Sequence, residues 1–114
     1  MDLPAISDEV MNTVRASAQI YTAVILHRTA KRDEPSSEAI IWEHGRRNIA
    51  LRAAGVLSIV CPIRDGGNVA GIGIFKGDVA EVTAILEGDP AIQAGILTCE
   101  IHACRGFPGD SLPA

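Results

Sequence analysis

Hydrophobic positions recur along the chain with two different spacings, and their order predicts the fold. Short stretches rich in β-branched residues predict strands, at Ile20–Arg28, Val56–Ile63, Val69–Phe75 and Ile96–Ala103. Hydrophobic residues three and four positions apart predict helices between them. These helices cover about Asp8–Ala18, Ser36 or Ser37 to Ala54, and Asp78 to Gly95 with a break at Gly88. Ser36 or Ser37 is the predicted cap of the second helix.

Turn and capping residues mark the ends of these elements. Asp65-Gly66-Gly67-Asn68 lies between two apolar runs and predicts a hairpin, whereas the polar stretch 29–37 predicts a loop. Asp89-Pro90 predicts a helix start, because Asp is a favoured N-cap and Pro suits the first helical position. Gly95 then ends that short helix, as Gly55 ends the long one.

The element order β-α-β-β-α-β predicts an α+β domain of the ferredoxin-like type, with helices on one face of an antiparallel sheet. The run Val56-Leu57 with Ile59-Val60 is apolar on both sheet faces. We therefore expect a second copy to cover the open face, giving a homodimer with packed sheets. Residues 1–114 form one domain. Its core covers about 20–104, with an N-terminal helix extension (1–19) and a C-terminal tail (105–114).

Composition narrows the functional classes. The chain is 47% hydrophobic and 21% charged, with a formal net charge of −4. This charge argues against a nucleic-acid partner, and no apolar run approaches the ~20 residues of a membrane span. The N-terminus lacks the pattern of a signal peptide. Cys61, Cys99 and Cys104 are odd in number and form no C-x-x-C pair, which predicts reduced, mostly buried thiols in a cytoplasmic protein.

The long helix carries the candidate chemistry. Its predicted apolar stripe is Ile41, Trp42, Ile49 and Ala53. His44, Asn48 and Leu51 share the adjacent face, at i, i+4 and i+7. Arg46, Arg47 and Arg52 on the same helix are interpreted as a solvated face and not as a phosphate site.

Other motifs favour structural interpretations. His27 and His102, at predicted strand ends, have no metal-ligand spacing, so we expect solvated histidines and no metal site. Gly71 and Gly73 share one face of a strand and leave room for a close approach. They do not form a dinucleotide fingerprint, because no helix opens directly behind them.

From Tyr21 to Ala103, ~three-quarters of the chain, the sequence resembles the YCII-related family of the dimeric α/β-barrel superfamily. The matching features, in order, are His44, Leu51, Gly55-Val56-Leu57, Pro62, Asp89-Pro90 and Ala94-Gly95-Ile96. This resemblance implies a ferredoxin-like dimer with a His–Asp pair in a pocket, here His44 and Asp89. It also implies small ring compounds as substrates, because a related branch eliminates chloride from chlorinated hydroxyhydroquinones. The chain departs from the family pattern at Asn48, Cys61 and Ala91.

The functional hypothesis is a small-molecule enzyme in which His44 is the general acid or base and Asp89 orients it. Asn48 polarises the ligand, and Cys61 borders the pocket. Isomerisation or elimination on a cyclic or phenolic compound needs no cofactor. Two alternatives remain: a ligand-binding or sensing module without turnover, and a structural interpretation in which Asp89 is only a helix cap and His44 is inert.

Overall fold

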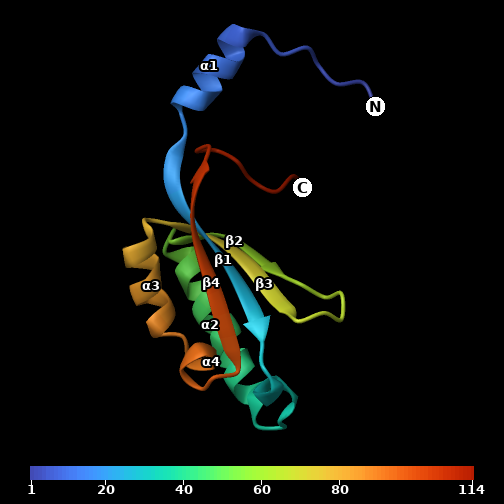
Figure 1. Ribbon diagram of the computed structural model, residues 1–114, viewed down its shortest axis with the longest axis vertical. Coiled ribbons are helices and arrows are strands. Elements are labelled where there is room, and N and C mark those ends of the chain that lie inside the picture. The colour runs from blue at the N-terminus through green and yellow to red at the C-terminus, as the bar shows by residue number, and fades with distance from the viewer.

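A four-stranded antiparallel sheet forms the centre of the computed structural model, which describes residues 1–114 (Figure 1). Its strands are β1 (Gln19–Arg28), β2 (Leu57–Pro62), β3 (Val69–Lys76) and β4 (Leu97–Gly106), in the order β2-β3-β1-β4. The four predicted strands are confirmed, and the α+β arrangement is compatible with a ferredoxin-like fold. The C-terminal tail begins later than predicted, because β4 continues until Gly106 pairs with Gln19 of β1.

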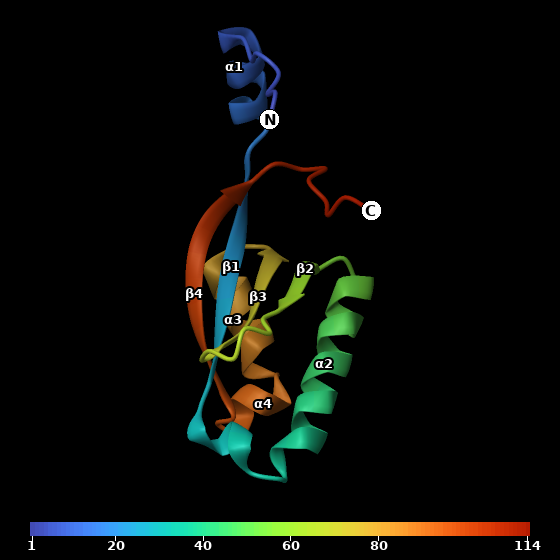
Figure 2. The same ribbon diagram turned by 90° about the vertical axis from the view of Figure 1, so that its right-hand side faces the viewer.

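Helices cover one face of this sheet. They are α2 (Ser37–Ala53), α3 (Val79–Glu87) and the short α4 (Pro90–Gln93), all on the same side (Figure 2). The N-terminal helix α1 (Asp8–Ala16) stands apart from the sheet and has no buried residue (Figure 1). A 3-10 turn, η1 (Ala30–Asp33), lies within the predicted loop between β1 and α2. None of the helices is both long and apolar enough to cross a membrane.

The core lies between the sheet and α3 and α4. Val24, Leu57 and Phe75 point from the strands towards Val82 and Leu86 of α3. A second cluster joins Ala91 of α4 to Ile96 and Leu97 at the start of β4. Only 13 of the 114 residues are buried, so much of the apolar surface of this chain remains uncovered.

The predicted apolar stripe of α2 holds only at Ile41, which packs against the core, and is wrong at the other three positions. Trp42 is 69% exposed and Ile49 is 55% exposed, and Ala53 is also exposed. The inward face instead carries His44, Asn48 and Leu51. Polar side chains are stable there because they are hydrogen-bonded to one another and to Asp89.

The start of α2 also differs from the prediction of a serine cap. Ser36 occupies the N-cap position, but its side chain makes no capping hydrogen bond. Ser37 is buried, and its hydroxyl donates to the Arg32 carbonyl at 2.6 Å. This hydroxyl therefore ties the helix to η1 and does not cap the helix itself.

The sheet face away from the helices, called the outer face below, is apolar in its middle. The register places Ile25 on β1, Ile59 on β2, and Ile72 and Ile74 on β3 on this face. Ile72 is 38% exposed, and the other three are partly exposed. No element of the chain covers the outer face (Figure 2).

Candidate functional site

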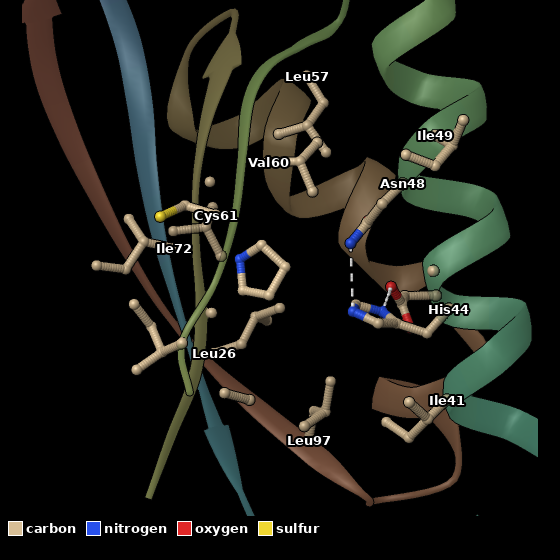
Figure 3. Close-up of a pocket in the computed structure, with 18 of the residues that line it drawn as sticks. Leu26, Ile41, His44, Asn48, Ile49, Leu57, Val60, Cys61, Ile72 and Leu97 are labelled. Atoms are coloured by element: carbon tan, nitrogen blue, oxygen red, sulfur yellow. Dashed lines mark hydrogen bonds and ion pairs between the residues drawn. The ribbon is translucent and has the colours of Figure 1, made fainter. Parts of the chain in front are cut away.

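A cavity of about 710 Å³ opens between α2 and the sheet (Figure 3). Most of its wall is apolar and comes from all four strands, with Val24, Leu26, Leu57, Val60, Pro62, Phe75 and Leu97 among its residues. A wall of this kind, with a few polar groups, is typical of small-molecule sites. The exposed side chains of Trp42 and Ile49 also border the cavity.

Two glycines of β3 help to create this space. Gly71 and Gly73 both border the cavity, as their shared face of the strand predicted. A Cβ atom at Gly73 would lie 3.1 Å from both the Leu57 and the Phe75 side chains. Any larger side chain at this position would therefore enter the space between the sheet and α2.

His44 and Asp89 meet at this cavity. The Nδ1 atom of His44, on α2, lies 2.6 Å from Oδ2 of Asp89, which is 45 residues away in sequence. Their side chains are only 13% and 4% exposed, respectively. An ionised carboxylate only accepts hydrogen bonds, so Nδ1 carries the proton and donates it. The contact therefore selects the tautomer of the neutral ring that leaves Nε2 as the acceptor atom.

The carboxylate of Asp89 performs two tasks with its two oxygens. Oδ1 accepts from the backbone N–H groups of Ala91 at 2.8 Å and Ile92 at 3.4 Å, which caps α4. Oδ2 is left for His44. The interpretation of Asp89 as only a helix cap is thus too narrow, because capping and contact with His44 occur together.

The pKa of Asp89 results from opposing effects. Burial raises it, but the hydrogen bond and the charge of His44, with the N–H groups of Ala91 and Ile92, lower it by more. The net pKa is lower than the ordinary value of 3.8. Asp89 is consequently an anion at neutral pH, which suits it to orient an imidazole and to balance its positive charge.

Asn48 completes a chain of three polar side chains. Its Nδ2 atom lies 3.2 Å from Nε2 of His44, one helical turn away on the same face of α2 (Figure 3). The amide thus donates to the nitrogen that Asp89 leaves free. Asn48 borders the cavity, so this hydrogen bond lies where a ligand would meet the imidazole.

The cysteines take no part in this chain of contacts. Cys61 borders the cavity, but its side chain points away from His44 (Figure 3). It is also exposed, so the prediction of a buried thiol is wrong at this position, where register places the residue on the outer face. Cys99 is partly buried against the core. Burial, with the negative charge of Asp89, raises the pKa of its thiol.

The remaining histidines lie on the outer face. Nε2 of His27 and Nε2 of His102 each contact one carboxylate oxygen of Glu100, the latter at 3.2 Å. Both hydrogen bonds lower the pKa of Glu100, and the one from His102 has the larger effect. Both histidines are thus separated from His44 by the sheet, and the three do not converge on one site.

Four basic residues lie beside the cavity, each from a different segment: Arg28, Arg32, Arg46 and Arg64. Three of them, Arg28, Arg32 and Arg64, were not singled out from the sequence, whereas Arg46 is exposed, as predicted. The prediction of a solvated arginine face on α2 is wrong for Arg47, which donates to the Ile85 carbonyl of α3 at 2.9 Å. Arginines near turn residues are common in sequences, so no local signal distinguished these from surface charges.

A comparison with protein-family models and a comparison with curated proteins each find no match for this chain. Its functional assignment therefore rests on the residues of the site.

Proposed function

We propose that this protein is a small-molecule enzyme in which His44 transfers a proton and Asp89 orients the imidazole. The observation that carries the proposal is the 2.6 Å contact between Nδ1 of His44 and Oδ2 of Asp89 at an apolar cavity. A carboxylate on one ring nitrogen raises the basicity of the other nitrogen and stabilises the imidazolium that forms. The substrate class is a small cyclic or phenolic compound, which suits a largely apolar wall.

The reaction begins when the ligand displaces the Asn48 amide from Nε2 of His44. Nε2 then accepts a proton from an acidic C–H or O–H group, and the electron pair of that bond stays on the ligand. The negative charge of Asp89 balances the imidazolium. Return of the proton to another carbon gives isomerisation, whereas departure of an anionic leaving group gives elimination, after which the imidazolium releases its proton to water or to the departing anion. Neither outcome needs a cofactor, and the freed Asn48 amide is placed to polarise a ligand oxygen.

A ligand-binding module without turnover is the alternative. One observation favours it: Nε2 of His44 already accepts a hydrogen bond from Asn48. A ligand that leaves this contact in place would occupy the cavity without proton transfer. The alternative keeps the same cavity and the same ligand class, and differs only in that the bound ligand is released unchanged.

The same proposal includes a family and an oligomeric state. We assign the chain to the YCII-related family, as a ferredoxin-like protomer of a dimeric α/β barrel. The matching His44 and Asp89 pair, at the positions that the resemblance implies, supports this assignment. The apolar outer face supports the homodimer, because Ile25, Ile72 and Ile74 remain uncovered in one chain. A cytoplasmic location belongs to this proposal.

Turnover screening tests the catalytic proposal. Wild type, His44→Ala and Asp89→Asn are incubated with a panel of small phenols and lactones, and loss of substrate is followed by liquid chromatography. The control is Arg52→Ala, an exposed position on the same helix outside the cavity. We expect turnover that His44→Ala abolishes and Arg52→Ala retains. Equal activity in wild type and His44→Ala would contradict catalysis, and ligand binding without turnover would favour the alternative.

A further inference from the structure

The cavity is bordered by more positive than negative charge, although the whole chain is negative. Four arginines border it, against the carboxylates of Glu38 and Asp89, whereas the formal net charge of the chain is −4. Asp89 is already occupied by His44 and by the N-terminus of α4. The excess positive charge at the cavity therefore has no counterpart inside it.

Two of these arginines are neutralised by neighbours. Arg32 contacts Glu38 at 2.8 Å, and Arg46 contacts Glu43 at 3.2 Å. Both acidic partners are exposed on α2. These pairs account for Arg32 and Arg46 without any ligand.

Arg28 is held in place without being neutralised. Its guanidinium donates to the carbonyls of Gly67 and Val69, each at 2.7 Å, and to that of Ile63 at 3.2 Å. Carbonyl oxygens carry no formal charge, so the guanidinium keeps its full positive charge. Three contacts also fix its position, which lowers the entropic cost of binding an anion.

Arg64 is a second basic residue at this cavity. It follows Ile63, whose carbonyl accepts from Arg28, and it borders the cavity. Arg64 is exposed, and it takes part in none of the ion pairs or side-chain hydrogen bonds of the structure. The backbone that holds Arg28 thus leads directly to an arginine without a carboxylate partner.

A second, polar hollow adjoins this end. It measures about 300 Å³ and shares Arg28 and Arg32 with the main cavity. The turn glycines Gly66 and Gly67 form part of its border, together with the carboxylate of Asp33. Arg28 therefore borders an apolar compartment on one side and a polar one on the other, which suits a ligand with two unlike ends.

We propose that the ligand of this site carries one anionic group, a carboxylate or a phosphate, bound between Arg28 and Arg64. Its apolar body then lies along the strand wall and reaches His44. A planar guanidinium matches the geometry of either anion. This inference rests on the proposed function for its site but concerns recognition alone, so it is tested by binding.

Binding of three probes of similar size tests the inference: benzoate, phenyl phosphate and neutral benzyl alcohol. Trp42, the only tryptophan of the chain, borders the cavity and reports binding through its fluorescence. The variant is Arg64→Gln, whose exposed position makes misfolding of little concern, and the matched control is Arg52→Gln. The main titrations use low salt, and a repeat at high salt measures screening.

We expect at least one anion to bind wild type about tenfold more tightly than benzyl alcohol, as a charge-assisted hydrogen bond provides. The tighter anion identifies the group. The preference should fall several-fold in Arg64→Gln and at high salt, and remain in Arg52→Gln. Equal affinities for the three probes, no binding of either anion, or a preference that survives Arg64→Gln would overturn the inference.

A further variant separates this inference from the catalytic proposal. His44→Gln removes the acid–base group and leaves both arginines in place. Anion preference that persists in His44→Gln, with no turnover in wild type, would leave the binding inference standing and remove the catalytic one. Turnover that depends on His44, without any anion preference, would support the catalytic proposal and overturn the binding inference.

Discussion

Replacing Asp89 by asparagine separates the two tasks of this carboxylate. Asparagine caps helices as well as aspartate does, so Oδ1 can still accept from the N–H of Ala91. The side-chain amide that replaces Oδ2, however, is a donor facing the N–H of His44. The variant therefore keeps the cap of α4 and loses the charge-assisted hydrogen bond that Nδ1–H of His44 donates to the carboxylate.

The magnitude follows from burial and charge. Both side chains are at most 13% exposed, and a hydrogen bond to a charged group in such a place contributes about 2 kcal/mol to the free energy of unfolding. Asp89→Ala also removes the cap, which costs about 1 kcal/mol more. For a urea dependence of about 2 kcal/mol per molar, Asp89→Asn lowers the midpoint of unfolding by roughly 1 M.

The assay is urea unfolding followed by far-UV circular dichroism at one fixed protein concentration, because the stability of the proposed dimer depends on concentration. The pKa of Asp89 is lower in the folded chain than its ordinary value of 3.8. Its ionisation therefore stabilises the fold above that value, and this contribution is lost as the pH falls through the folded pKa. The difference between wild type and Asp89→Asn should shrink below pH 3.8. Equal midpoints at neutral pH would refute the reasoning.

Three further predictions test other parts of the structure. Gly95 has a φ of +73°, so Gly95→Ala should destabilise the chain by about 1 kcal/mol. Gly45→Ala, in the middle of α2 with open space at its Cβ, should stabilise it by a similar amount; unfolding midpoints that move in the same direction would contradict this contrast. Ile72→Glu on the outer face should convert the proposed dimer to a monomer, measured by light scattering at micromolar concentration. A wild-type chain that is already monomeric would contradict the dimer. Because burial and the charge of Asp89 raise the pKa of Cys99, iodoacetamide should alkylate this thiol more slowly in the native chain than in urea, and equal rates by mass spectrometry would disagree with its placement.

Local chemistry was sufficient to predict the features that depend on neighbouring residues. Asp89, Pro90 and Gly95 delimit α4 as their preferences require. His44 and Asn48 share a helix face because they are four residues apart. The four strands follow from their β-branched composition and from the turn residues between them.

Features that depend on distant partners were not predictable in the same way. The inward face of α2 tolerates His44 and Asn48 beside Leu51 because Asp89, 45 residues from His44, accepts its hydrogen bond, whereas the more hydrophobic Trp42 is exposed. Arg47 is held by a carbonyl of α3. Arg28 is held by carbonyls of the β2–β3 loop, at residues 63 and 67, and of the first residue of β3. Such contacts arise from tertiary packing, which hydrophobic spacing on a single element does not encode.

The most direct test of the central claim is a two-bond ¹H–¹⁵N spectrum of the His44 ring, recorded across a pH titration in wild type and in Asp89→Asn. Above the pH at which the ring loses its charge, the structure predicts that wild-type His44 is held as the Nδ1–H tautomer, because Oδ2 of Asp89 accepts that proton. Asp89→Asn should change the tautomer of the ring, because it removes the acceptor at Nδ1. A wild-type ring that exchanges between tautomers as an exposed imidazole does, with the same spectrum in Asp89→Asn, would contradict the acid–base pair.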